Sequence, residues 1–226
     1  MIRACMFDLD GTLADTLETL AYFTNLVLSE EGLAPIETEA YKKLVGDGLF
    51  ELMHRALLRS GAEADEKRCE RLSERFRQLY FADVLNRTRV YSGMPEALSR
   101  LKEMGLTLTV LSNKPDPAAQ QVVRELFGEG TFALVSGNKA GVPRKPAPDG
   151  ALMQAAALGI APQEFLYIGD TDTDMQTGNA AGMHTVGVLW GFRDEKELRE
   201  NGAEYLAERP EDIAELVKRL NQCKNN

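Results

Sequence analysis

The stretch that decides the fold lies near the start of the chain, where residues 4–12 read Ala4-Cys5-Met6-Phe7-Asp8-Leu9-Asp10-Gly11-Thr12. The apolar residues predict a short buried strand, and the glycine predicts a turn directly after it. In an extended segment residues two positions apart face the same side, so the carboxylates of Asp8 and Asp10 can reach one ligand. Gly11 lets backbone amides approach an anion. The segment predicts a chemical site at a strand end, although Asp and Gly are also ordinary turn residues.

The composition is that of a globular protein with a hydrophobic core. Of the 226 residues 44% are hydrophobic, which is enough for one domain or for a domain with an insertion. No apolar run approaches the roughly 18 residues of a membrane span. The cysteines Cys5, Cys69 and Cys223 have no paired spacing, which favours reduced thiols and a cytoplasmic location, with Cys5 in the core. The net charge of −9 disfavours nucleic acids and membranes as partners.

Residues 17–80 have a helical pattern that differs from the pattern on either side. Leu20, Phe23 and Val27 mark one helix, which Gly32 ends. A shorter helix is expected at residues 39–45, and two more follow, one from about residue 49 to 61 and one that begins near residue 65. We therefore expect an all-helical cap at residues 15–81, inserted into a core formed by residues 1–14 and 82–226.

From residue 91 onward strands and helices alternate. Short, continuously apolar strands are expected at residues 106–111, 132–135, 165–168 and 185–188. The helices between them are expected near residues 95–105, from residue 117, and at residues 149–158 and 174–181. Such strands indicate a parallel sheet covered on both faces. The expected fold is α/β, a doubly wound, Rossmann-like parallel sheet, in which ligands bind beyond the carboxyl ends of the strands.

Polar residues stand where three of these strands end. Ser112 and Asn113 follow the strand at 106–111, Lys145 lies between prolines in the loop after the strand at 132–135, and Asp170 follows the strand at 165–168. Ser112, Asn113 and Lys145 each have a simpler alternative interpretation. Ser112 and Asn113 could simply cap a helix, and another cation of the same loop, at position 139 or 144, could take the place of Lys145.

Three acids at alternate positions, Asp170, Asp172 and Asp174, indicate a divalent metal. A calcium-binding EF-hand loop is excluded, because Met175 and Ala181 stand where that motif requires glycine and glutamate. Asp174 is also expected to favour the start of the next helix, which does not prevent Asp170 from binding a metal.

Taken in order, these residues resemble the signature motifs of the haloacid dehalogenase superfamily of aspartate-nucleophile phosphotransferases. The matching motifs are Asp8-Leu9-Asp10-Gly11-Thr12, Ser112, Lys145, and Gly169-Asp170 with Asp174. The resemblance covers the whole chain, because a helical cap inserted after the first motif is also a family feature. The Val45-Gly46-Asp47-Gly48 turn and the Gly187-Val188-Leu189-Trp190-Gly191 segment resemble the phosphoglycolate-phosphatase-like subgroup.

The resemblance implies a mechanism built on paired carboxylates. Asp8 would attack phosphorus and become an aspartyl-phosphate, while Asp10 would protonate the departing alkoxide and then activate water. Mg²⁺ would be held by the Asp8 carboxylate, the Asp10 backbone carbonyl and the Asp170 carboxylate. Asp174 would orient Lys145 or a metal-bound water, and Asp172 could share that work.

The resemblance also implies how phosphate is bound. Lys145 would supply a second positive charge beside the metal, as a catalytic and phosphate-binding residue. The Ser112 hydroxyl and the backbone amides near Gly11, Thr12 and Asn113 would receive the phosphoryl oxygens.

Departures from neighbouring families narrow the chemistry. Haloacid dehalogenases lack the second aspartate, and sugar-phosphate mutases have an acid and an arginine where this chain has Gly169 and Leu49. A phosphatase acting on a small phosphomonoester is preferred, because a helical lid leaves little room for a macromolecule. Phosphoglycolate is the leading candidate, and inorganic pyrophosphate, a sugar phosphate or a nucleotide are alternatives. The rival from another class is a non-catalytic phospho-acceptor or binding module, which would gain nothing from Asp10 as a water-activating group.

The cap is expected to set the substrate specificity. The turn at residues 46–48 could reach into the cleft, and Lys43 and Arg55 could meet a substrate carboxylate, although ordinary solvation at a helix surface is the preferred interpretation. Asp15, Thr16 and the segment 81–91 are the expected hinges. Both a monomer and a homodimer are compatible with the sequence.

Overall fold

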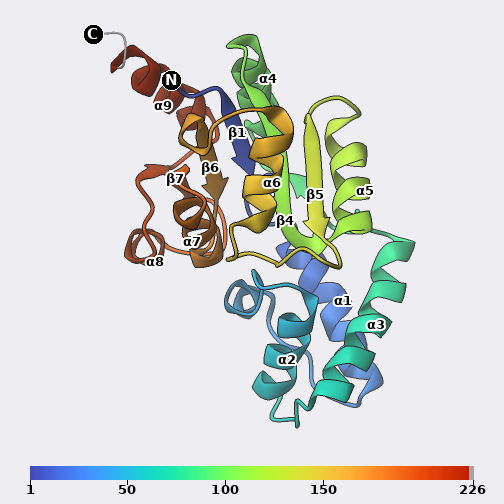
Figure 1. Cartoon of the computed structure of the whole chain (residues 1–226). Helices are drawn as coiled ribbons and strands as arrows, with labels where there is room; N and C mark the ends of the chain where they lie inside the picture. Colours follow the sequence, from blue (N-terminus) through green and yellow to red (C-terminus); the bar gives the residue numbers. More distant parts are fainter. Residues whose placement is uncertain (224–226) are drawn as a thin grey trace.

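The computed structural model describes residues 1–223, and within them one parallel sheet forms the centre of the molecule (Figure 1). The strand order is β5-β4-β1-β6-β7-β8, and every neighbouring pair is parallel. The bounds of the strands are Ala4–Phe7 for β1, Thr107–Pro115 for β4, Leu134–Asn138 for β5, Phe165–Gly169 for β6, His184–Val188 for β7 and Tyr205–Ala207 for β8. The strand order reverses beside β1, so the expected ligand site lies at the carboxyl end of β1.

Helices cover both faces of this sheet, which confirms the predicted doubly wound α/β fold. One face packs against α4 (Met94–Glu103), α5 (Asp116–Phe127) and α9 (Glu211–Cys223), and the other packs against α6 (Asp149–Leu158) and α7 (Asp172–Ala180). Strand β1 is buried throughout, with Cys5 and Phe7 in one core cluster and Ala4 and Met6 in the other. This alternation explains why all four residues are apolar.

A second group of helices lies beyond the carboxyl ends of the strands (Figure 1). It contains α1 (Leu17–Glu30), the 3-10 helix η1 (Thr38–Lys43), α2 (Leu49–Arg59) and α3 (Glu66–Ala82). Phe23 of α1 packs edge-on against Phe76 and Tyr80 of α3, with ring centroids 6.1 and 5.5 Å apart. Such aromatic contacts bury large apolar areas, so these helices pack on one another as well as on the sheet.

The two chain connections between these helices and the sheet pair with each other. Strand β2 (Ala14–Asp15) runs antiparallel to β3 (Arg89–Val90). The segments expected as hinges therefore form a small two-stranded ribbon. Their movement stays a prediction.

Several element boundaries differ from the predicted ones. Strand β5 begins at Leu134, because Phe132 packs before it against Phe7 and Phe127. Helix α7 begins at Asp172, two residues early, because the Thr171 side chain caps it. The predicted helix at residues 39–45 is the 3-10 helix η1. The last elements of the chain, α8 (Glu195–Glu200), β8 and α9, were not predicted.

Candidate active site

Asp8 and Asp10 lie in the tight turn that follows β1. The Asp8 amide still donates to the carbonyl of Ile168 on the neighbouring strand (2.9 Å), which fixes the position of Asp8. The carbonyl of Leu9 accepts hydrogen bonds from three amides of the turn, those of residues 12, 13 and 14. Gly11 has φ +86°, and a Cβ there would lie 2.2 Å from Asp170 Oδ2. Only glycine fits this turn, since the backbone is left-handed and packs directly on a carboxylate.

Three carboxylates meet beneath this turn. Oxygens of Asp8, Asp170 and Asp174 all lie within 4.8 Å of one another, and all three residues are buried. Burial raises the pKa of Asp8 from 3.8 to about 7, with the charge of Lys145 opposing the rise. Burial and the neighbouring carboxylates of Asp174 and Asp8 also raise the pKa of Asp170 well above its usual value. Burial and mutual repulsion therefore disfavour the fully ionised form of the cluster.

The donor set of this cluster fits a divalent cation that prefers oxygen ligands. Asp170 is held in place from both sides, because Oδ1 accepts from the Thr12 hydroxyl (2.9 Å) and Oδ2 accepts from the Phe192 amide (2.9 Å). A Cβ on Gly191 would lie 2.2 Å from the Cβ of Asp170. The backbone thus forms a close cradle around this carboxylate, as expected for a residue that orients a metal ligand.

Lys145 brings the positive charge into this cluster. Its Nζ lies 2.9 Å from Asp8 Oδ1 and 2.6 Å from Asp174 Oδ1, and the side chain is buried. Burial would lower the pKa of Lys145, but the carboxylates of Asp174 and Asp8 raise it well above its usual value. The alternative cations of the same loop, Lys139 and Arg144, are exposed. The geometry therefore selects Lys145 among the three.

Asn113 positions the Lys145 loop. Its side chain donates to the Lys145 carbonyl (3.0 Å) and accepts from the Lys145 amide (2.9 Å). The same Nδ2 donates to the carbonyl of Gly46 (3.0 Å), on the turn between η1 and α2. Asn113 therefore joins three separate segments of the chain at the site.

The structure separates Asp174 from Asp172. Asp174 is fully buried and accepts hydrogen bonds from the hydroxyl of Thr171 (2.7 Å) and the ammonium of Lys145. The side chain of Asp172 is 37% exposed and lies 3.8 Å from the Arg193 guanidinium. Because helix α7 begins at Asp172, these two acids do not share a face as they would in a strand. Asp172 is thus outside the carboxylate cluster.

The remaining predicted phosphate ligands lie at the site, but two of them have other partners. Ser112 is buried within β4, which continues to Pro115 instead of ending at the predicted residue 111, and its hydroxyl accepts from the amide of Lys114 (3.2 Å). The Gly11 amide donates to Ala14 and the Thr12 amide to Leu9, since both close the turn. In this structure these two amides are therefore used within the chain and not free for phosphoryl oxygens.

Lys114 is a site residue to which the sequence analysis gave no function. Its Nζ lies 2.9 and 3.1 Å from the two carboxylate oxygens of Asp10, and the side chain is buried. It also lies over the ring of Tyr80, 4.8 Å from the centroid. The sequence carries no local signal for this role, because the register between β4 and β5 changes between Leu111 and Pro115.

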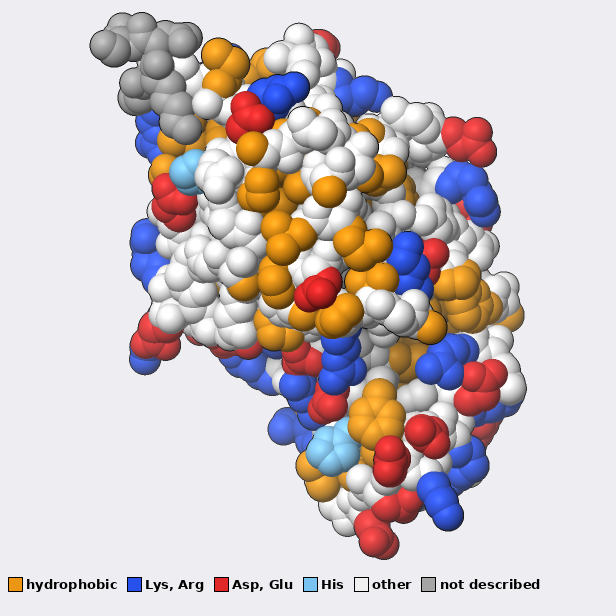
Figure 2. Space-filling model, viewed as in Figure 1, with side chains coloured by type: hydrophobic (Ala, Val, Ile, Leu, Met, Phe, Trp, Pro, Cys, Tyr) orange, Lys and Arg blue, Asp and Glu red, His pale blue; other side chains and the backbone are white. Residues whose placement is uncertain are grey.

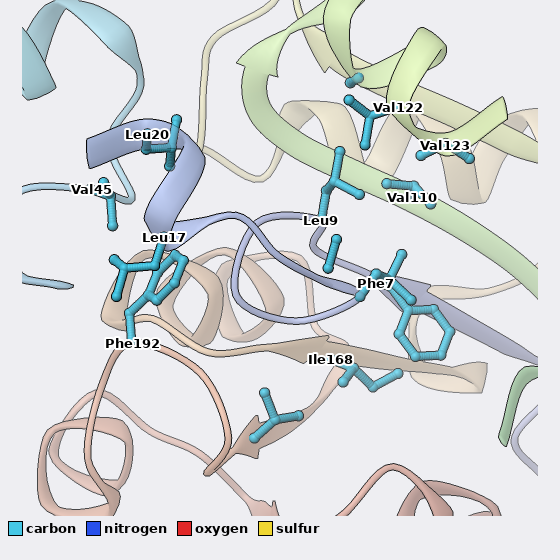
Figure 3. Close-up of a cluster of buried hydrophobic side chains, with 14 of the residues drawn as sticks. Phe7, Leu9, Leu17, Leu20, Val45, Val110, Val122, Val123, Ile168 and Phe192 are labelled. Carbon is cyan, nitrogen blue, oxygen red and sulfur yellow. The ribbon is translucent and has the colours of Figure 1, made fainter. Parts of the chain in front are cut away.

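A cleft opens between the sheet and the second group of helices, and Asp8 and Asp10 lie in its wall. Figure 3 shows Leu17, Leu20, Val45 and Phe192 gathered where α1 leaves the turn after β1, so the core continues up to the cleft. The turn at residues 46–48 contributes Gly46 and Gly48 to the lining, as expected from the sequence. The cleft is therefore enclosed by apolar side chains on the helical side.

Lys43 and Arg55 do not line this cleft. Lys43 pairs with Glu197 (2.6 Å), and Arg55 pairs with Asp47 (2.5 Å) and donates to the Leu44 carbonyl. Both cations are thus engaged in ion pairs, which differs from simple solvation at a helix surface. Neither meets the place where a substrate would lie.

The visible surface has no block of one charge. Figure 2 shows Lys and Arg side chains intermixed with Asp and Glu on this face of the molecule. Within residues 1–223 no helix combines the length and the apolar character that a membrane crossing needs.

Comparisons with known proteins agree with this geometry. A family model of haloacid dehalogenase-like hydrolases matches residues 5–188. The phosphoglycolate phosphatase of Chromobacterium violaceum is 34% identical over 218 residues, covering 96% of this chain and 97% of that protein. The phosphoglycolate phosphatase of Aquifex aeolicus is 31% identical over 216 residues, covering 96% and 97%. A solved structure from Lactobacillus delbrueckii subsp. bulgaricus superimposes with a TM-score of 0.90 at 30% identity, covering 95% of this chain and 98% of that one.

Proposed function

Because the chain belongs to the haloacid dehalogenase-like hydrolases, we propose that it is a Mg²⁺-dependent phosphatase of a small phosphomonoester, with phosphoglycolate as the leading candidate. Relatives named phosphoglycolate phosphatase match nearly the whole chain and support a phosphoric monoester hydrolase. The observation that carries the proposal is the buried cluster of Asp8, Asp170, Asp174 and Lys145 at the strand-order reversal. A phosphoryl group needs a nucleophile and several positive charges at one point, and this cluster provides for both.

The carboxylates of Asp8 and Asp170, with the backbone carbonyl of Asp10, would hold the Mg²⁺ ion. When bound, this ion would neutralise charge on the phosphoryl group and lower the repulsion between the substrate and Asp8. Lys145 supplies a second positive charge, and the buried Ser112 hydroxyl donates to a phosphoryl oxygen. Asp174 keeps Lys145 beside Asp8 through the 2.6 Å contact with its ammonium.

The two carboxylates of the turn then divide the reaction. An Asp8 oxygen attacks phosphorus, and the bond to the leaving oxygen breaks as Asp10 gives that oxygen a proton. Asp10 next takes a proton from water, which attacks the aspartyl-phosphate and regenerates Asp8. The burial of the two side chains supports this division. Both side chains line the cleft, but that of Asp10 is the more exposed, at 18% against 9% for Asp8.

Residues 15–81 serve as the cap in this proposal, over a core of residues 1–14 and 82–226. Across the cleft, Asn113 donates to the Gly46 carbonyl and Thr173 donates to Asp47 (2.9 Å). A cap that opens about the β2 and β3 connections would break these contacts and admit a small phosphorylated metabolite. Closure would exclude bulk water from the intermediate.

The test is a phosphate-release screen over small phosphomonoesters and pyrophosphate with Mg²⁺ or with excess EDTA. Wild-type protein is expected to release phosphate only with the metal. Asp8→Asn should reduce kcat on the order of 10⁴-fold or more, and Asp10→Asn about 10²- to 10⁴-fold. Asp172→Asn is the matched control, since this neighbouring acid lies outside the cluster, and its activity should stay close to wild type. Full activity of Asp8→Asn would refute the mechanism, and isomerised product without net phosphate would indicate a mutase.

A further inference from the structure

The cleft contains a buried ammonium that the proposed chemistry does not use. Lys114 is 93% buried, and its Nζ contacts both oxygens of Asp10. An ammonium has three donors, so a further one remains after the two contacts with Asp10. The other cation that lines the cleft, Arg77, is 43% exposed and bound to Glu74 (2.7 Å). Lys114 is therefore the one buried positive charge of the described cleft lining.

The hydroxyl of Tyr80 lies in the same part of the cleft, beside Lys114, and makes no well-formed hydrogen bond. Tyr80 is 3% exposed, and within residues 1–223 its OH makes no hydrogen bond of ordinary geometry, although the ammonium of Lys114 lies close enough to oppose the rise of its pKa. Burial raises the pKa of Tyr80, so the hydroxyl keeps its proton and can donate. Buried polar groups are normally satisfied, and an unsatisfied one facing a cleft indicates a ligand.

An irregularity of the sheet aims Lys114 at this point. Between the pairs Leu111 with Ser136 and Pro115 with Asn138, strand β4 advances four residues while β5 advances two. The extra residues cannot stay in register with the neighbouring strand, so the chain bends there. Ser112 and Lys114 both line the cleft as a result. Bulges that redirect side chains are common beside active sites.

Most of the helical side of the pocket around Lys114 and Tyr80 is apolar. Its helical side is lined by Leu20, Leu49, Leu52, Phe76 and Phe81. In such surroundings a charged ligand group without a partner is strongly disfavoured. An anion in this part of the cleft therefore depends on the two donors.

We propose that Lys114 and Tyr80 bind a carboxylate on the leaving group of the substrate, an inference that rests on the proposed phosphatase function. The proposed leaving oxygen lies at Asp10, and Lys114 contacts that same carboxylate, so an anion one methylene away from the oxygen can reach Nζ. A singly charged carboxylate suits the site better than a second phosphate, because Asp10 already offsets much of the Lys114 charge.

The test compares two substrates that differ only at this group, phosphoglycolate and ethyl phosphate, which has a methyl in place of the carboxylate. The readout is the ratio of their kcat/KM values, in which any damage to Asp10 cancels. Lys114→Met is expected to lower this ratio about 10- to 100-fold, and Tyr80→Phe about 3- to 10-fold. Arg77→Met is the matched control and should leave the ratio unchanged. Melting temperatures of all variants show that they are folded, and Tyr80→Phe tests the site if Lys114→Met fails to fold.

Different failures have different meanings. A wild-type ratio near one, or equal losses on both substrates in Lys114→Met, would overturn the carboxylate site and leave the phosphatase function intact. A lower ratio in Arg77→Met alone would assign the anion to Arg77 and overturn the inference. A larger loss on pyrophosphate than on phosphoglycolate in Lys114→Met would mean that the site binds phosphate. No phosphate release from any of the three by wild-type protein would refute the proposed function itself, and the inference with it.

Discussion

The buried carboxylates should couple metal binding to pH and to stability. Asp8, Asp170 and Asp174 lie within 4.8 Å of one another, with Lys145 as the ammonium among them. The burial that raises the pKa of Asp8 from 3.8 to about 7 also means that the metal-free folded protein holds protons that the unfolded chain has lost. Removing the metal and raising the pH should therefore both lower the free energy of unfolding.

The sign and size of the change in unfolding free energy with pH follow from the raised pKa of Asp8. A group with a raised folded pKa contributes its stability below the unfolded value of 3.8 and loses it as the pH rises through about 7. From about pH 5 to about pH 8 the loss is about 2 to 3 kcal/mol, at about 1.4 kcal/mol per unit. Mg²⁺ at a hundred times its Kd restores about 2.7 kcal/mol. For a chain of this length that corresponds to a rise in melting temperature of roughly 5 to 11 °C.

The assay is scanning calorimetry in excess EDTA and in excess Mg²⁺, at about pH 5 and about pH 8. The Mg²⁺-induced rise should be larger at the higher pH, because protons compete with the metal at the lower one. Asp170→Asn should be more stable than wild type without metal and lose the Mg²⁺ effect, whereas Asp172→Asn should keep it. The reasoning is refuted if Asp170→Asn retains the full Mg²⁺ effect, or if metal-free wild type is equally stable at both pH values.

Three further outcomes are expected. Gly191→Ala places a Cβ 2.2 Å from Asp170 and 2.6 Å from the Gly11 carbonyl, so calorimetry should show a loss of about 1 to 3 kcal/mol and a smaller Mg²⁺ effect. Asp174→Asn should reduce kcat/KM about 10- to 100-fold in the phosphate-release assay, since Lys145 loses a partner that orients it. Arg193→Met removes the donors to the Lys42 and Val45 carbonyls, so hydrogen exchange should speed up at residues 42–48, and an unchanged rate there would contradict the assigned contact.

Much of the fold follows from local patterns. The buried strands are largely apolar runs. Asp8 and Asp170 directly follow β1 and β6, and Ser112 lies in the second half of β4. The three come together because the carboxyl ends of parallel strands share one edge. Strand β8 was missed because it has only three residues, and residues 205 and 206 are not fully buried. A short, half-exposed edge strand lacks the apolar run from which a strand is predicted.

The assignment of Asp172 shows where pattern reasoning ends. Alternate acids at 170, 172 and 174 look equivalent in an extended chain, but the Thr171 side chain accepts from the Asp174 amide and starts helix α7 within that run. The helix directs the Asp174 side chain into the cluster, where it contacts Lys145, and places the Asp172 side chain near Arg193. The distinction depends on the Thr171 cap. This cap sets where the side-chain period changes from the two residues of an extended chain to the 3.6 residues of a helix.

Lys114 could not be assigned from the sequence, because its placement depends on a change of register between β4 and β5 that no local pattern encodes. Yet this register change gives the two carboxylates of the turn different environments. Asp8 shares Lys145 with Asp174 in a closed cluster, and Asp10 has Lys114 at the cleft. In the proposed mechanism, the nucleophile beside the metal and the proton donor beside the leaving group would need these different surroundings. As proposed, Lys114 would bind the part of the substrate that the motifs do not specify, beside the carboxylates that they do predict.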